Sequence, residues 1–120
     1  MTPQPKKSSL ADVHLRYLQL VKAVESLSSS PAMDANEAAL LNALSLHWHA
    51  GKPLAVREAM TLDKLGSPST LHRRISRLKA LGLIDDKSSP GNLRIKLLVP
   101  SQKALNFFDK LGAALNKTKA

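Results

Sequence analysis

The sequence predicts a mainly α-helical domain that carries one small β-hairpin and is flanked by two terminal helices. Three observations lead to this prediction. Apolar residues recur at helical spacing along most of the chain. A stretch rich in Asp, Ser, Pro, Gly and Asn separates two short apolar runs between residues 83 and 99, as in a hairpin. A chain of 120 residues has room for one modest core.

The composition restricts the class of partner. Eighteen Lys and Arg against nine Asp and Glu leave a net charge of +9, which favours a polyanion such as nucleic acid but also fits an anionic membrane surface. The absence of cysteine excludes disulfides, thiolate zinc sites and cysteine catalysis. Because no long apolar run or secretory leader is visible, we expect a soluble cytoplasmic protein, associated with the nucleoid and with no membrane partner.

The N-terminal part divides into an arm and a helix. Residues 1–8 have two prolines and two lysines, which predict a disordered basic arm that stays in solvent rather than in a minor groove. Residues 9–30 hold a helix capped by Ser9 with Asp12 and reaching about Leu27. Its apolar stripe alternates in steps of three and four residues: Leu10, Val13, Tyr17, Leu20, Val24 and Leu27. The stripe predicts pairing along another helix, either in a homodimer or in the same chain.

A core helix follows. Asp34 and Glu37 form a capping box, and the helix runs to Ala50 and stops at Gly51. Its core stripe is Leu41, Leu44 and Trp48. His47 and His49 invite comparison with a metal site, but residues two apart on a helix point about 200° from each other, so we predict none.

The next segments predict a helix-turn-helix. Lys52 to Leu54 is expected to form a very short edge strand, Val56 to about Leu62 a short helix, and Asp63 to Ser67 a turn. A second helix then starts with Ser67 as N-cap and Pro68 in its first turn, and ends at Gly82. Its narrow apolar stripe predicts packing against the core: Leu71, Ile75, Leu78 and Gly82.

The opposite face of this second helix is basic. Arg73 and Arg77 point away from the stripe, and no Asp or Glu occurs between Lys64 and Ile84. This pattern predicts a recognition helix that enters the major groove and contacts phosphates and base edges. Its candidate DNA-binding residues are Ser67, Ser69, Thr70, His72, Arg73, Arg74 and Arg77. The alternative is a basic face that is merely solvated.

A β-hairpin is predicted directly after the recognition helix. Leu83 and Ile84 form its first strand, Asp85 to Asn92 its turn, and Leu93 to Val99 a half-buried second strand. Such a hairpin is a wing, and its tip can contact phosphates or the minor groove. Its candidate DNA-binding residues are Lys87, Asn92 and Arg94. The wing beside the arginines favours DNA binding over the solvated face, and we assign the DNA-binding domain to residues 34–100.

Residues 101–120 are expected to form a last helix, from Ser101 to about Asn116, and a basic tail. One side of the helix is more apolar than a lone surface helix needs, which predicts a second dimerisation element. Its candidate dimerisation residues are Phe107, Phe108, Leu111 and Leu115.

The order of elements and several motifs resemble the winged helix-turn-helix regulators of the MarR type, best over residues 54–105. The motifs are SPST at residues 67–70, LGLI at residues 81–84 and LVPSQKAL at residues 98–105, together with Arg73, Arg77 and Leu78. The resemblance implies a winged helix, a homodimer and a transcriptional regulator that binds a pseudo-palindromic operator. The chain departs from the family at Asn92 and Leu93, where Asp and Arg are usual, and at Arg74, where an apolar residue is commoner.

The sequence therefore predicts a dimeric, sequence-specific regulator that binds double-stranded DNA. It favours neither catalysis nor a cofactor, because the carboxylates are scattered and no glycine-rich phosphate loop is present. The alternative is a protein-interaction or assembly module in a replication or plasmid-maintenance complex. Single-stranded nucleic acid is disfavoured because the basic helix and the wing lack aromatic residues for base stacking. Neither the operator nor a small-molecule effector can be named from the sequence.

Overall fold

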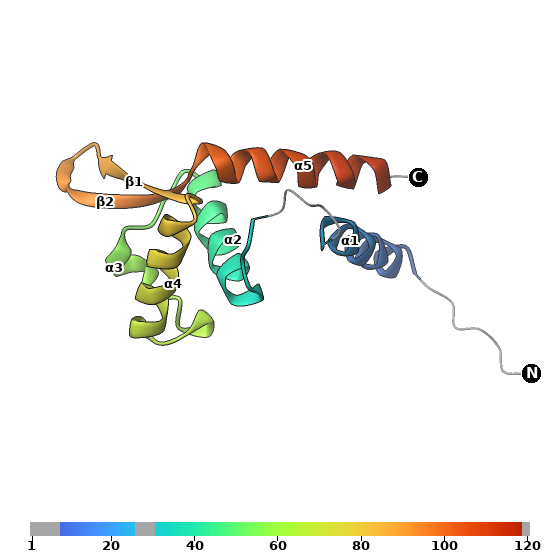
Figure 1. The fold of residues 1–120 in the computed structure, drawn as a ribbon, viewed down its shortest axis with the longest axis horizontal. Coiled ribbons are helices and arrows are strands. Elements are labelled where there is room, and N and C mark those ends of the chain that lie inside the picture. Colours follow the sequence, from blue (N-terminus) through green and yellow to red (C-terminus); the bar gives the residue numbers. More distant parts are fainter. Residues whose placement is uncertain (1–7, 26–30, 119–120) are drawn as a thin grey trace, which may run out of the picture. The chain divides into compact units, whose positions relative to one another are not determined.

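The computed structural model describes residues 8–25 and 31–118 (Figure 1). The chain divides into two compact units, residues 1–30 with 107–120 and residues 31–106, and each is described by itself. The elements in chain order are α1 (Ser9–Glu25), α2 (Ala35–His49), α3 (Val56–Ala59), η1 (Asp63–Leu65), α4 (Pro68–Ala80), β1 (Ile84–Ser89), β2 (Asn92–Pro100) and α5 (Gln102–Thr118). None of the helices among the described residues is long and apolar enough to cross a membrane.

The core of the second unit lies where α2, α4 and the β1–β2 hairpin meet. Leu71, Ile75 and Leu78 of the predicted stripe are buried, whereas Gly82 lies after the end of α4 and is exposed. Helix α2 and the hairpin contribute leucines to the same core. The fully buried large side chains are Leu40, Leu41, Leu44, Leu71, Leu78, Leu83 and Leu98. The placement of Trp48 in this core is wrong: it lies near the end of α2 and is exposed, whereas Leu40, one turn before Leu44, is buried.

Both ends of α4 are terminated as the sequence predicts. The side chain of Ser67 accepts a hydrogen bond from the backbone N–H of Thr70, and Pro68 occupies the first turn. At the other end, Gly82 adopts φ +75°, a left-handed conformation that suits glycine. There the N–H of Leu83 donates to the Leu78 carbonyl and that of Gly82 to the Lys79 carbonyl, both at 2.9 Å. These two bonds form a Schellman motif, which fixes the direction in which the chain leaves α4.

The region before α4 differs from the prediction. No strand forms at residues 52–54; β2 is joined instead by a single bridge between Ala55 and Leu97 and by a backbone hydrogen bond from Leu98 to Leu54. Helix α3 ends at Ala59, and the expected turn contains the short 3-10 helix η1. Gly66 then adopts φ +141°, which residues with a side chain rarely adopt. This tight turn joins the two helices of the helix-turn-helix.

The wing is longer than predicted. β1 and β2 pair in antiparallel orientation from Ile84 with Pro100 to Ser88 with Lys96, so most of the predicted turn is strand. Only Pro90 and Gly91 lie between the strands. The second strand is also less buried than expected, because both Leu93 and Ile95 in the outer part of the hairpin are exposed. Polar residues form strand in the outer part of the hairpin because the two strands are held together by backbone hydrogen bonds. These bonds require neither apolar side chains nor an alternation of apolar and polar residues.

Ser101 joins the start of α5 to the end of α4. Its hydroxyl donates to the Gly82 carbonyl at 2.6 Å and accepts from the N–H of Ala104 at 3.1 Å. Its own N–H donates to the Leu83 carbonyl. Ser101 is buried, and it therefore acts at once as the N-cap of α5 and as a brace for the turn that follows α4.

The N-cap of helix α1 is Ser8, one residue earlier than predicted. Ser8, which we had assigned to the arm, accepts a hydrogen bond from the N–H of Ala11 through its hydroxyl, and Asp12 pairs with Arg16. The remaining arm, residues 1–7, and the predicted end of the helix at Leu27 lie outside the described residues. The predicted apolar stripe is exposed at Leu10, Val13 and Tyr17.

Candidate nucleic-acid interface

The outer face of α4 begins with a cluster of hydroxyls. Ser67 donates to the hydroxyl of Thr70 at 3.0 Å and lies 3.4 Å from that of Ser69, oxygen to oxygen. Ser67 and Ser69 are exposed, and Thr70 is half-buried beside Gly66. The N-terminus of a helix attracts anions through its unpaired N–H groups, and these hydroxyls add donors in the same place. The cluster can bind a phosphate or a base edge.

Arg73 and Arg77 form an arginine ridge one turn further along α4. Arg73 is exposed and has no hydrogen bond or ion pair with another residue in the described ranges 8–25 and 31–118. The Nε of Arg77 lies 3.3 Å from Oε2 of Glu37 on α2, and its side chain is 53% exposed. The other oxygen of Glu37 accepts from the N–H of Asp34, so this buried carboxylate completes the predicted capping box and orients Arg77 at once. Within the described part of the chain neither Nη group of Arg77 has a hydrogen-bond partner, so both can donate to a ligand.

Arg74 is placed differently from its neighbours. Its Nη1 donates to the Leu65 carbonyl at 2.6 Å, and the side chain is half-buried against the turn at Gly66. The guanidinium therefore satisfies the last carbonyl of η1 and ties α4 to the preceding turn. The sequence spacing already placed Arg74 on the buried side of the helix, since Arg74 follows Leu71 by three residues and precedes Leu78 by four.

A contact that the sequence analysis missed holds the wing to α4. The Nζ of Lys79, in the last turn of α4, lies 2.9 and 3.0 Å from the two carboxylate oxygens of Asp86 on β1. Asp86 had been assigned to a turn, so no partner on the helix was expected for it. Both side chains are more than a third exposed, and such an ion pair contributes less to stability than to the orientation of the wing.

Of the predicted wing residues, Asn92 and Arg94 lie near the free end of the hairpin, whereas Lys87 lies in the middle of β1, opposite Leu97. Lys87, Asn92 and Arg94 are all exposed, and Oδ1 of Asn92 accepts the backbone N–H of Arg94 at 3.0 Å. Lys96, which the sequence analysis did not select, donates to the hydroxyl of Ser88 on the opposite strand at 2.8 Å. Side-chain hydrogen bonds therefore brace the end of the hairpin, with Arg94 near the turn and Lys96 and Lys87 further from it on the two strands.

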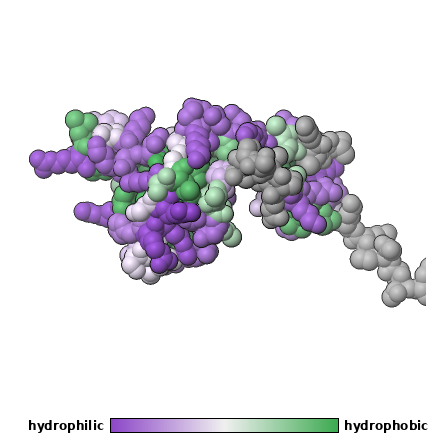
Figure 2. Space-filling view, in the orientation of Figure 1, coloured by the Kyte–Doolittle hydropathy of each residue, from purple (hydrophilic) through white to green (hydrophobic). Residues whose placement is uncertain are grey.

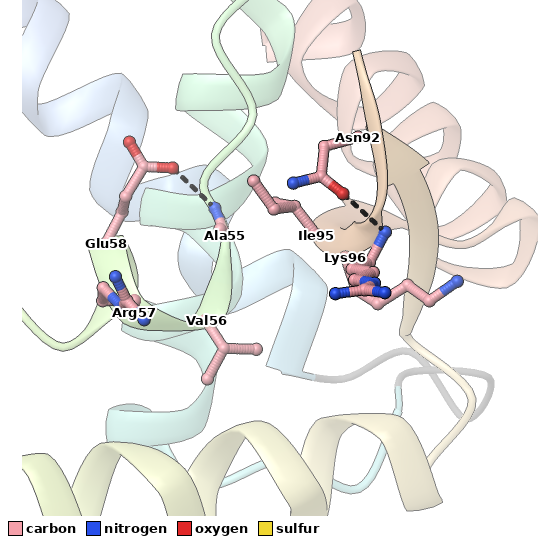
Figure 3. Close-up of a pocket in the computed structure, with 8 residues that line it drawn as sticks. Ala55, Val56, Arg57, Glu58, Asn92, Ile95 and Lys96 are labelled. Carbon is pink, nitrogen blue, oxygen red and sulfur yellow. Dashed lines mark hydrogen bonds between the residues drawn. The ribbon is translucent and has the colours of Figure 1, made fainter. Parts of the chain in front are cut away.

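An open groove of ≈ 690 Å³ lies between the start of α3 and the outer half of β2 (Figure 3). We call it the wing groove. Its lining residues are Ala55, Val56, Arg57, Glu58, Asn92, Arg94, Ile95 and Lys96. The carboxylate of Glu58 accepts the N–H of Ala55 at 2.9 Å, so three cations face one carboxylate that already has a partner. Arg57 was missed because a lone arginine on a short helix carries no sequence signal until the wing is folded beside it.

The charge of these surfaces favours a phosphate backbone as the partner. Helix α4 supplies an arginine ridge and hydroxyls, and the wing supplies Lys87, Arg94 and Lys96 on a segment with no Asp or Glu between residues 87 and 97. Cations at fixed separation on a helix and a hairpin can neutralise several phosphates at once, which is the sequence-independent part of DNA binding. The ridge adds side chains that can pair with guanine edges.

Known structures with similar folds were found, although their sequences are distant. MepR of S. aureus bound to ethidium bromide matches with TM-score 0.66 at 10% identity, over 94% of this chain and 79% of that one. The MepR–DNA complex matches with TM-score 0.60 at 10% identity, over 90% and 73%. The transcriptional regulator Tm0710 of Thermotoga maritima matches with TM-score 0.62 at 18% identity, over 90% and 70%. Crystallised MarR matches with TM-score 0.52 at 14% identity, over 92% and 72%.

These neighbours confirm the predicted winged helix-turn-helix fold and, at the level of the fold, the resemblance to MarR-type regulators. No protein-family model matches the sequence, and no curated protein matches it either.

Proposed function

We propose that this chain is a DNA-binding transcriptional regulator that binds double-stranded DNA in a sequence-specific manner as a homodimer. The observation that carries the proposal is the arginine ridge, which projects from α4 because Leu71, Ile75 and Leu78 behind it are buried. A helix of this design beside a basic hairpin matches the arrangement in which the recognition helix enters the major groove. The DNA in the MepR complex, a fold neighbour, supports the same class of partner.

Within the proposed complex the residues have different roles. Arg73 and Arg77 contact base edges or phosphates in the major groove, with Ser67, Ser69, Thr70 and His72 on the phosphates beside them. Lys87, Asn92 and Arg94 contact the backbone or the minor groove, and Arg74 positions α4 from behind. The dimer forms through the apolar faces of α1 and α5, which places two recognition helices about 10 bp apart on a pseudo-palindromic site.

The test uses the full chain and a duplex obtained by selection from a random pool. Binding is measured by gel shift against excess random competitor at several salt concentrations. If each half of the dimer neutralises three to five phosphates, we expect a log–log salt slope of about −6 to −9. The single substitutions Arg73→Ala and Arg77→Ala should each weaken binding by about 1 to 3 kcal/mol. Equal affinity of the Arg73→Ala/Arg77→Ala double variant and the parent at physiological salt would contradict the assignment of α4 to the groove.

A protein-interaction or assembly module is the second candidate. It predicts that the parent retains no duplex in the same gel shift, because its basic face would meet an acidic protein surface. The absence of any acidic side chain on the exposed end of the wing is compatible with both candidates, whereas the spacing of Arg73 and Arg77 on one helix face favours DNA.

A further inference from the structure

An apolar patch lies at the free end of the wing. A wing that contacts DNA would be expected to carry a cationic side chain at this position. Figure 2 shows a hydrophobic patch at the end of the hairpin, among hydrophilic residues. Leu93 is 73% exposed and Ile95 is 42% exposed. A single exposed leucine on a surface is ordinary, but this one lies near the tip of a hairpin, directly before Arg94. We propose that Leu93 enters the minor groove as an apolar wedge that selects the base pairs flanking the half-site. The inference rests on the proposed function.

The two apolar side chains have different surroundings. Ile95 lines the wing groove with Ala55 and Val56 (Figure 3), so part of its surface is already covered. Leu93 is not among the residues that line the groove. It therefore has the larger apolar surface left to bury, and the bend at the tip presents it beyond Arg94. The hydrogen bond from the N–H of Arg94 to Asn92 fixes that bend, so the leucine is presented by a braced backbone.

The charges around Leu93 identify the occupant as DNA. Arg94 follows Leu93 directly, Lys96 and Lys87 lie further from the turn on the two strands, and residues 87–97 contain no Asp or Glu. The wing groove beside the tip adds Arg57, which gives a seat for the phosphates next to an inserted side chain. Apolar side chains such as leucine are used in this way between base steps, and flexible pyrimidine–purine steps yield to them most easily.

The consequence is a readout by shape. Leucine offers no donor or acceptor, so it cannot pair with a base edge as an arginine can. It is excluded where the guanine amino group fills the floor of the minor groove, and it is admitted at A·T pairs. The wing would thus prefer A·T-rich or easily opened flanks, while the major-groove sequence is set by α4.

The experiment compares the parent, Leu93→Ala and Leu46→Ala on the selected duplex. Leu46 is the matched control, because it is an exposed leucine of α2 that belongs to neither the ridge nor the wing. We expect Leu93→Ala to bind about 10-fold more weakly, since a buried leucine is lost, with the salt slope unchanged because no charge is removed. Leu46→Ala should bind as the parent does. Thermal unfolding of all three proteins verifies that each is folded.

A second measurement changes the DNA instead of the protein. Replacing flanking G·C pairs by inosine·C removes the guanine amino group from the minor groove and leaves the major-groove edge intact. The parent should gain several-fold in affinity on the inosine duplex, and Leu93→Ala should gain nothing.

The outcomes distinguish a failure of the proposed DNA binding from a failure of the Leu93 wedge. A parent that retains no duplex overturns both the proposed function and this inference. A parent that binds, with Leu93→Ala equal to it, overturns the wedge alone and points to a protein contact at the tip. A Leu93→Ala variant with a shallower salt slope, or with the parent's preference for inosine, overturns it as well.

Discussion

The three arginines of α4 show how much the environment of one residue decides. Arg73 is exposed and points to the proposed groove, Arg77 is oriented by the buried carboxylate of Glu37, and Arg74 is turned back to the Leu65 carbonyl. All three are cations in one five-residue stretch, and composition alone treats them alike. A guanidinium that satisfies a carbonyl inside the protein stabilises the fold, whereas one that faces solvent is available for a partner.

This difference predicts that substitution by alanine affects stability at Arg74 and DNA binding at Arg73. Arg74→Ala should lower the free energy of unfolding by about 1.5 to 3 kcal/mol, because the Leu65 carbonyl loses a charged donor. Arg73→Ala, its neighbour on the same helix, should leave stability within about 0.5 kcal/mol of the parent while weakening DNA binding. Urea unfolding followed by circular dichroism measures both. Equal stability of the two variants would show that Arg74 does not hold the turn.

At the scale of elements, α4 is fixed at both ends by different means. Its start depends on the Ser67 cap, on Gly66 in a conformation open to glycine, and on the Arg74 contact behind it. Its end depends on the Schellman turn at Gly82 and on Ser101, which connects that turn to α5. The wing leaves directly from this braced end and is further joined to α4 through Lys79 and Asp86. Helix α4 and the wing are therefore oriented together.

Ser101 tests this brace. Ser101→Ala removes a buried hydroxyl that caps α5 and donates to Gly82, so the free energy of unfolding should fall by about 2 to 3 kcal/mol. Ser101→Thr keeps the hydroxyl and should recover most of the loss. Ser76→Ala is the matched control, since Ser76 is an exposed serine of α4. The urea unfolding midpoints of the three variants measure these changes. An unchanged midpoint for Ser101→Ala would show that the Ser101 hydroxyl does not stabilise the turn after α4.

At the scale of the whole molecule, the proposed dimer follows from apolar surface that one chain leaves exposed. Leu10, Val13 and Tyr17 of α1 are all more than half exposed, and Leu115 of α5 is 46% exposed. Phe107, Phe108 and Leu111 are half-buried, with the two phenyl centroids 6.2 Å apart. An apolar helix face of this extent is stabilised when a second copy covers it, and two-fold symmetry then supplies two recognition helices.

The dimer is tested by sedimentation of the full chain at micromolar concentration. We expect a particle of twice the chain mass. Val13→Glu places two like charges in the apolar interface and should shift the particle to the monomer mass, with a loss of DNA affinity that follows. Gln19→Glu adds the same charge on α1 outside the predicted stripe and should remain dimeric. A parent that sediments as a monomer would contradict the dimer without affecting the fold.

The sequence by itself determined the parts of the fold that depend on near neighbours. The capping box at Asp34 and Glu37, the Ser67 cap, the end of α4 at Gly82 and the burial of Leu71, Ile75 and Leu78 were all predicted and are confirmed. Each depends on residues within about two helical turns of each other, where spacing and residue type suffice to predict the contact.

The tertiary structure decided what depends on residues far apart in the chain. The pairing of β1 with β2 made strand out of a polar stretch that the sequence marked as a turn, and it exposed Leu93 and Ile95 where a half-buried strand was expected. It also gave Asp86 its partner, Lys79, and formed the wing groove with Arg57. Hydrophobic periodicity cannot report such contacts, because whether a side chain is buried, paired or free depends on which distant element packs beside it.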